Sequence, residues 1–406
     1  MPRFGDGPTT TTRRTVRPPE FAHPRGAAGS RCRRLSRAAF CSVHQLTPDI
    51  TPRESDHVKQ LRPATPQPQA TPEQGNVGDS QTVEQKSFLH FATRAGSVVV
   101  ESRPVLLIIL IVALGAFVYI EKGPSFLSTA NLSAVATNAS GTCILTIGMM
   151  MLMVSGVFDL SIGGSLVLAG VISAIAANNG VPVPLAWLVG VGVGILCGIV
   201  NGLVVTRIQL NALITTLGTA AVFTGMAQLF SQTGVTSIVP GYQTLGQDEI
   251  WQLQLPVWIS IGFVLVFTVL LRYHRWFRNL LAVGGNEWAA RVCGINTRRV
   301  RFSAFVLMGG LVGITAVLTA SRFAAAELSA GDNVPLNVIT ASVLGGAALT
   351  GGKGSIPGAA LAVFFIALVG DALIILNIGV FWQEIIIGGI LLVAVSTEYL
   401  QRRSET

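Results

Sequence analysis

The chain has 406 residues, of which 50% are hydrophobic and only 12% are charged, and this composition excludes an ordinary soluble domain. Its formal net charge is +8, but residues 1–103 hold 15 Lys and Arg against 9 Asp and Glu, which leaves only +2 for the remaining residues. Because the positive charge belongs mainly to the N-terminal segment, it does not indicate nucleic-acid binding.

The first 100 residues differ in composition from the rest. Residues 1–85 are rich in Arg, Pro, Thr, Gln and Gly, so a disordered, basic and proline-rich extension is expected over residues 1–100. The acid-free stretch 31–37 is compatible with a transit peptide, and a gene start assigned too far upstream is the alternative. A cleaved secretory signal is not expected, because no apolar core precedes residue 104.

From Pro104 the sequence is a series of apolar runs long enough to cross a membrane, which takes about 20 helical residues. We therefore expect residues 101–401 to form an all-α polytopic membrane domain with about ten transmembrane helices. Runs two and three, and runs nine and ten, are so close that hairpins or broken helices must join them. The expected helices are 104–121, 131–156, 161–179, 184–206, 211–231, 255–272, 300–321, 336–350, 356–376 and 379–400.

Lys and Arg residues in the short loops predict the orientation, because they concentrate on the cytoplasmic side. With the N-terminus inside, eleven of them face the cytoplasm and only Lys122 and Arg322 face outward. Both termini are therefore expected inside. The eleven are Arg207, Arg272, Arg275, Arg278, Arg291, Arg298, Arg299, Arg301, Lys353, Arg402 and Arg403.

The charged segment 284–295, between apolar runs, predicts a short capped helix on the cytoplasmic side. Asn286 suits the N-cap, and Glu287 suits the first turn, where a negative charge complements the helix dipole. Gly294 suits the left-handed residue that ends a helix. Glu287 and Arg291 are four residues apart, in the favourable order for an ion pair.

The other face of this short helix is apolar. Trp288, Val292 and Ile295 share it at helical spacing. About two turns are too short to be stable alone in water, so we expect the helix to dock onto a cytoplasmic protein.

The glycine-rich run 345–355 invites comparison with a phosphate-binding loop. It departs from G-x-x-x-x-G-K-[ST] at two positions, because Ala347 replaces the first glycine and Gly354 the final Ser or Thr. ATP binding is therefore not expected, and we interpret the run as a cytoplasmic turn between two membrane helices. Its characteristic residues are Gly345, Gly346, Gly351, Gly352, Lys353 and Gly354.

Ionisable side chains at membrane depth are costly, so each needs a physical reason. Asp159, near Ser161 in the tight link between the second and third runs, either caps the third helix or lines a pathway, and capping is favoured. Asp371 and Glu384 lie toward the outer ends of their runs. Each either borders a polar vestibule or lies at the membrane interface.

Asn211, Thr215 and Thr216 begin the fifth run and are a further group of polar candidates. They either offer hydrogen bonds in a cavity or bond to their own helix, as helical hydroxyls often do.

No arrangement of a nucleophile and a base is visible, and no metal-ligand spacing. The five cysteines lie far apart or inside apolar runs, and the five histidines all lie outside the runs. We therefore expect no enzyme and no metal site. The residues by themselves indicate a multi-span transporter or channel with a cytoplasmic docking helix.

Four stretches, in the same order along the chain, resemble the ribose-type sugar permeases of ATP-binding-cassette importers, in the superfamily of ribose, xylose and branched-chain amino acid permeases. They are 124–132, 158–163, 284–295 and 343–354, and the likeness covers roughly residues 100–400. Trp288 is bulkier than the residue usual in this family.

The resemblance implies the permease subunit of an ATP-driven importer in the bacterial inner membrane, which carries a pentose or a related monosaccharide into the cytoplasm. Its partners would be a cytoplasmic ATPase subunit, an extracytoplasmic binding protein that is periplasmic or lipid-anchored, a second permease copy (a homodimer) and membrane lipid. ATP binds to the ATPase, so no cofactor is expected here. The coupling helix that contacts the ATPase would comprise Asn286, Glu287, Trp288, Ala289, Ala290, Arg291, Gly294 and Ile295.

Other substrates stay open within the resemblance: nucleosides, autoinducer-type sugars or branched-chain amino acids. A more distant alternative is a secondary transporter driven by an ion gradient.

Overall fold

The computed structural model describes residues 103–405, which belong to one compact unit. The expected extension 1–100 lies outside these residues. The elements are α2 (Arg103–Lys122), η1 (Gly123–Leu127), α3 (Thr129–Val154), α4 (Ile162–Asn178), α5 (Val183–Leu203), η2 (Val204–Ile208), α6 (Ala212–Phe230), α7 (Thr244–Gln247), β1 (Glu249–Ile250), β2 (Leu253–Gln254), α8 (Leu255–Tyr273), α9 (Arg275–Gly285), α10 (Glu287–Val292), α11 (Thr297–Phe323), η3 (Leu328–Gly331), α12 (Val334–Leu344), α13 (Ile356–Ile375) and α14 (Val380–Glu405).

The all-α membrane architecture is confirmed for the part of the chain that the structure describes. Its only sheet pairs the two-residue strands β1 and β2. Seven helical segments there are long and apolar enough to cross a membrane: Pro104–Leu127, Thr129–Val154, Val183–Ile208, Ala212–Phe230, Leu255–Tyr273, Thr297–Phe323 and Ile356–Ile375. Helix α4 and the stretch Phe381–Ser396 of α14 are shorter apolar helices. Each of the ten predicted runs contains a helix, and the number of spans remains a prediction.

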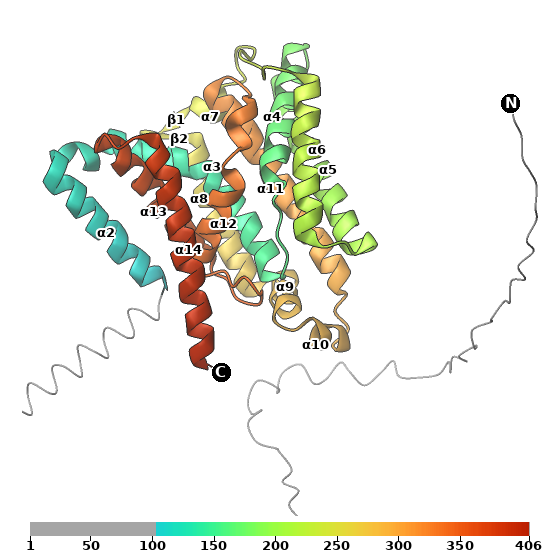
Figure 1. The fold of residues 1–406 in the computed structure, drawn as a ribbon. Helices are drawn as coiled ribbons and strands as arrows, with labels where there is room; N and C mark the ends of the chain where they lie inside the picture. The colour runs from blue at the N-terminus through green and yellow to red at the C-terminus, as the bar shows by residue number, and fades with distance from the viewer. Residues whose placement is uncertain (1–102, 406) are drawn as a thin grey trace, which may run out of the picture. The chain divides into compact units, whose positions relative to one another are not determined.

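The predicted helices differ from the observed ones most clearly at one helix end and at one link. The run 336–350 was predicted too long, because α12 ends at Leu344, where Gly345 and Gly346 interrupt the helix and Gly346 takes a φ of +109°. The prediction from hydropathy could not place this break, because the residues on both sides of the two glycines are apolar or small. The tight link after α3 reverses the chain: residues 155–161 are not helical, and they run as an extended segment from the end of α3 to the start of α4 (Figure 1).

Helix α11 is the centre of the packing, in contact with α3, α4 and α5. Its approach to α5 depends on glycines, because a Cβ on Gly309 would lie only 2.9 Å from the Cα of Gly198. Small residues let helix backbones approach where lipid supplies no hydrophobic drive for association. The C-terminal half of α3 is the most deeply buried stretch, with Met149–Val154 fully enclosed.

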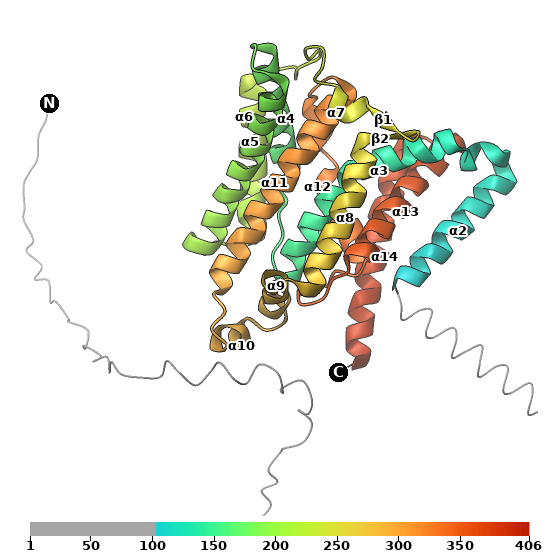
Figure 2. The same cartoon turned by 180° about the vertical axis from the view of Figure 1, so that it is seen from behind.

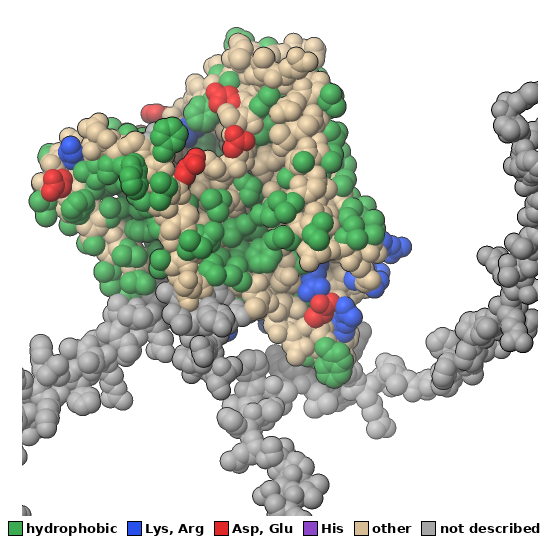
Figure 3. Space-filling view, in the orientation of Figure 1, with side chains coloured by type: hydrophobic (Ala, Val, Ile, Leu, Met, Phe, Trp, Pro, Cys, Tyr) green, Lys and Arg blue, Asp and Glu red, His purple; other side chains and the backbone are tan. Residues whose placement is uncertain are grey.

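The ends of the helices differ from their sides. The start of α2, the short helices α9 and α10, and the end of α14 lie at the same end of the helices in both ribbon views (Figures 1 and 2). In the face seen in Figure 3, charged side chains gather near the two ends and hydrophobic ones cover the region between them. This distribution fits a membrane-spanning domain whose α10 end faces the cytoplasm, as the loop charges predict.

Candidate functional site

The short helix predicted within residues 284–295 is shorter in the structure than that segment. Gly284 and Gly285 end α9, and α10 itself comprises only Glu287–Val292. Its caps are confirmed: the Asn286 side chain accepts a hydrogen bond from the Ala289 amide at 2.9 Å, and Gly294 has a φ of +81°. These local interactions explain where so short a helix begins and ends.

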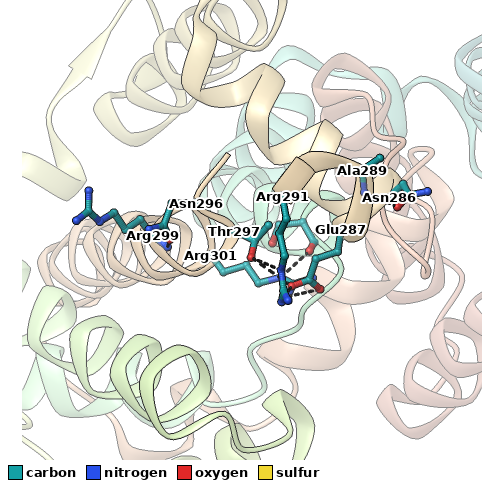
Figure 4. Close-up of polar contacts among 9 residues, drawn as sticks. Asn286, Glu287, Ala289, Arg291, Asn296, Thr297, Arg299 and Arg301 are labelled. Carbon is teal, nitrogen blue, oxygen red and sulfur yellow. Dashed lines mark hydrogen bonds and ion pairs between the residues drawn. The ribbon is translucent and has the colours of Figure 1, made fainter. Parts of the chain in front are cut away.

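A cluster of charges ties α10 to α11. The Glu287 carboxylate lies 2.5 Å from Arg291 and 2.9 Å from Arg301, and it accepts a 3.2 Å hydrogen bond from the Thr297 hydroxyl (Figure 4). Partial burial would raise the pKa of Glu287, but the hydrogen bonds and positive charges of the two arginines outweigh it and lower the pKa below its ordinary value. Glu287 is therefore ionised at neutral pH.

Arg301 extends this cluster to a third element. Its Nε donates a 3.1 Å hydrogen bond to the carbonyl of Ser155, the residue that follows α3. One arginine of α11 thus links α10 to the end of α3 and to the extended link after it. The sequence motif contained Glu287 and Arg291 but not Arg301, which lies 14 residues after Glu287.

A hollow of about 460 Å³ lies beside the charge cluster. Its walls combine Glu287, Arg291, Arg298 and Arg301 with the link after α3 and the turn between α5 and α6. Asn211, a predicted pathway residue, is among the lining residues.

The exposed face of α10 is apolar. Trp288 is 75% exposed and Val292 is 68% exposed, whereas Ala290 on the opposite face is buried. Ile295 does not share the exposed face as predicted, because it lies beyond the helix and packs partly buried against the core. An exposed tryptophan and valine side by side on a six-residue helix form a small surface suited to a protein partner.

The two glycine runs of the sequence form one junction. The Gly352 amide donates a 2.9 Å hydrogen bond to the Val154 carbonyl at the end of α3. A Cβ on Gly284 would collide with that same carbonyl, and one on Gly352, which has a φ of +79°, would lie 2.7 Å from the Cα of Gly285. The glycine-rich turn thus packs against the backbone of α3 and α9, with Lys353 exposed.

Gly345, another residue of the turn, also packs closely against a neighbouring helix. A Cβ added there would lie 2.4 Å from the Cα of Ala359 in α13. Gly351 has a φ of +91°, and a Cβ on Gly354 would press on Met150. These contacts give the turn a packing role.

Asp159 is buried in the link between α3 and α4. It accepts hydrogen bonds from the Ser161 amide at 2.8 Å and the Ser161 hydroxyl at 2.7 Å, one residue before α4 begins. Asn201 of α5 donates to the Ser161 oxygen at 2.6 Å and lies 3.4 Å from both Asp159 oxygens. Asp159 does not cap α4 itself, because Ser161 is the N-cap residue and Asp159 accepts from no amide within the helix. Its bonds instead order the turn that leads into α4, and a pathway role stays a prediction. Sequence reasoning missed Asn201, although a lone asparagine in an apolar helix was its signal.

The other predicted polar residues lie apart from Asp159. Asn211 caps α6 by accepting from the Leu213 amide, and Thr216 donates to its own helix at Ala212. The buried Thr215 hydroxyl has no partner in the described part of the chain.

Asp371 and Glu384 each accept a hydrogen bond from the side-chain amide of an asparagine. Asp371 accepts a 2.7 Å hydrogen bond from Asn131 at the start of α3, and Glu384 a 3.0 Å bond from Asn333 before α12. Both contacts join helices near the end opposite α10.

At that opposite end lie two adjoining hollows of about 210 Å³ each, which sequence reasoning did not identify. Both are bounded by α4 and α11, and the second also by α3. The polar lining residues of the second hollow include threonines of both α3 and α11. These residues are some 180 positions apart in the sequence, so spacing alone carried no signal.

The chain is similar to known transport proteins over most of its length. The family described as "Branched-chain amino acid transport system / permease component" matches residues 131–395. The L-arabinose transport system permease protein AraH of Escherichia coli (strain K12) is 33% identical over 304 residues, which are 74% of this chain and 91% of that protein. No solved structure gives a significant match.

Two further relatives are named for other substrates. The ribose import permease protein RbsC of Haemophilus influenzae is 28% identical and covers 74% of this chain and 93% of its own. The autoinducer 2 import system permease protein LsrC of Salmonella paratyphi B is 30% identical and covers 66% and 78%. These relatives are transport permeases rather than enzymes. With its apolar helices, the chain is a multi-pass cell-membrane protein, and it belongs to the permease family of ATP-binding-cassette sugar importers that the sequence motifs resemble.

Proposed function

We propose that the chain is the membrane subunit of an ATP-driven importer that carries a pentose or a related monosaccharide into the cytoplasm from an extracytoplasmic binding protein. The names of the relatives support a sugar-like substrate, since they specify L-arabinose, ribose and autoinducer 2. The family description instead names branched-chain amino acids, which are the competing substrate class.

The observation that carries the ATP-driven mechanism is the exposed apolar face of α10. Trp288 and Val292 protrude from a capped helix at the cytoplasmic end, and we assign them to a cleft in an ATPase subunit. That subunit binds the ATP, so this chain needs no cofactor of its own.

The interactions behind α10 provide a route by which a displacement reaches the membrane helices. A movement of α10 transmitted through Glu287 acts on Arg301 of α11, and from there on the carbonyl of Ser155 after α3. Closure of the ATPase on ATP would thus tilt α11 and α3 as rigid elements and change which side of the membrane the pathway opens to. Two permease copies in the inner membrane, each with its α10, would receive the two ATPase subunits.

The test co-expresses the chain with its ATPase and its binding protein and compares two variants. Trp288→Ala with Val292→Ala removes the apolar face, and it is expected to abolish both co-purification of the ATPase and ATP-dependent uptake of labelled L-arabinose or ribose. Trp251→Ala is the matched control, because Trp251 is 85% exposed on the β1–β2 turn at the opposite end.

Retained co-purification and uptake in the double variant would contradict the coupling role of α10. Uptake by the permease alone, driven by a proton or sodium gradient, would identify a secondary transporter instead. Uptake of leucine but of neither sugar would show that the substrate is a branched-chain amino acid, as the family description names.

A further inference from the structure

The two adjoining hollows at the outer end, together called the outer chamber, lie between α3, α4 and α11 and have largely apolar walls that carry a few polar side chains. They share Leu166, Thr319, Phe323 and Ala330 as lining residues, so they are continuous neighbours. They lie near the end of α11 opposite α10, and a helix of 27 residues spans about 40 Å. With α10 in the cytoplasm, this chamber faces outward.

One buried hydroxyl group in the chamber has no hydrogen-bond partner among the described residues. The Thr315 hydroxyl is buried, with the residue 2% exposed, and it has no hydrogen-bond partner within residues 103–405. A helical threonine ordinarily donates to a carbonyl one turn earlier, as Thr146 does to Thr142 at 2.7 Å. A buried polar group without a partner costs free energy, so its persistence calls for a ligand or a water.

Two further groups complete the chamber. At its rim the Arg322 guanidinium donates a 2.7 Å hydrogen bond to the Asn138 side-chain oxygen, which joins α11 to α3. This is the one hydrogen bond that the Arg322 guanidinium makes among the described residues, and a guanidinium has five N–H donors. The guanidinium also lies over the Phe323 ring, 5.1 Å from its centroid. The ring of Phe323 lines both hollows and offers an apolar surface.

The charges select the class of ligand. Arg322 lines one hollow and Glu327 the other, so the positive and negative charges of the lining balance. A neutral molecule with several hydroxyl groups matches this lining, because its hydroxyls both donate to and accept from threonine and asparagine. Its C–H face suits Phe323.

We infer that this chamber within a single permease is a binding site for a neutral polyol, with Thr315, Thr319, Asn138 and Arg322 as its hydrogen-bonding groups. The inference rests on the proposed function and specifies where the sugar first enters the membrane domain. It also gives Arg322, in the last turn of α11, a role in substrate binding.

The first experiment measures ATP-dependent uptake of L-arabinose, ribose and L-leucine by the reconstituted importer with its ATPase and binding protein. Thr315→Val removes a hydroxyl that the fold does not use while keeping the side-chain shape. It is expected to lower sugar uptake about 3- to 10-fold, the loss of one hydrogen bond to a substrate. Thr146→Val is the matched control, since its hydroxyl bonds only its own helix, and uptake should stay near the wild-type rate.

The second experiment detects occupancy without transport. Thr319→Cys, treated from outside with a membrane-impermeant maleimide, should be labelled, and sugar-loaded binding protein should slow the labelling when the full importer is assembled. Of the natural cysteines that the structure describes, Cys143 and Cys197 are buried and the exposed Cys293 lies at the α10 end, so none of these three competes for outside reagent. The remaining two, Cys32 and Cys41, are replaced by serine in the protein used for labelling.

The outcomes separate this inference from the proposed function. If the wild type imports sugar but Thr315→Val imports at the wild-type rate and Thr319→Cys is not protected, the chamber holds only water and the inference is wrong while the function stands. If leucine alone is imported and protects, the polyol assignment is wrong. If the complete wild-type importer moves none of the three with ATP, the proposed function itself fails.

Discussion

Glu287 of α10 and Arg301 of α11 form an ion pair with 2.9 Å between the carboxylate Oε2 and the guanidinium Nη1. The same arginine also holds the Ser155 carbonyl, so one side chain joins a surface helix to two membrane helices. The contact lies between the surface that we assign to the ATPase and the helices that enclose the outer chamber.

Replacing Glu287 by Gln should weaken transmission more than assembly. The variant keeps the size of the side chain and leaves Trp288 and Val292 exposed, so the ATPase should still co-purify. Sugar uptake per ATP hydrolysed should fall, because the charge-assisted bonds to Arg301 and Arg291 are lost. Since Glu287 is about one-third exposed, solvent screening limits the stability loss to about 1 kcal/mol. The control is Glu249→Gln in the exposed strand β1, which should leave coupling unchanged.

The same ion pair predicts a pH dependence of stability. The pKa of Glu287 is lowered in the folded state, so its stabilisation is present above the unfolded pKa, about 4.3, and is lost as the pH falls through the folded value. The stability difference between wild type and Glu287→Gln should therefore be constant from about pH 6 to 8 and shrink below about pH 4. Thermal unfolding in detergent across this range measures it. A difference that grows on acidification would contradict the assignment.

Gly352→Ala should destabilise the cytoplasmic end by about 1–3 kcal/mol, because alanine is strained at a φ of +79° and its Cβ meets Gly285. Gly218→Ala is the matched control: a Cβ there meets nothing within 4 Å, and alanine is the better helix former, so this variant should be neutral or more stable. The melting temperatures of the two variants test this prediction, and that of Gly352→Ala should be the lower. Equal effects of the two substitutions would show that the junction does not depend on glycine.

Asn201→Leu should destabilise the link between α3 and α4 by about 1–3 kcal/mol. It removes the donor to Ser161 and the amide near Asp159, and it leaves these buried groups with fewer partners. Asn179→Ala at the exposed end of α4 is the control and should change stability little. Protease sensitivity of the folded variant near the link would report local opening, and an unchanged melting temperature for Asn201→Leu would argue against the buried network.

The parts of the site that sequence reasoning predicted are those determined by local interactions. The caps of α10 depend on Asn286 and Gly294, which act within one turn of the helix. The apolar runs likewise predict the helices, because hydropathy follows composition along the chain. By contrast, Arg301 reaches Glu287 and Ser155 only after α11 has packed, and no sequence spacing indicates that contact.

Other features depend on the packing of distant segments. Asp159 and Ser161 are joined by Asn201, which lies on a different helix about 40 residues later, and Asn138 contacts Arg322 across 184 residues. The end of α12 differs from the prediction for a local reason. Gly345 and Gly346 fit an apolar run by composition, but the helix ends at Leu344 and Gly346 has a positive φ.

The junction of Gly284, Gly352 and Val154 has a mechanical consequence. Backbones that touch directly cannot absorb a displacement by changing rotamers, so α9, the end of α3 and the turn before α13 must shift together. Glycine is usually associated with flexibility. Here the absence of a side chain lets three backbone segments pack so closely that they move as one rigid body. A displacement of α10 therefore moves all three segments at this end of the helices, and the distortion is not confined to a single loop.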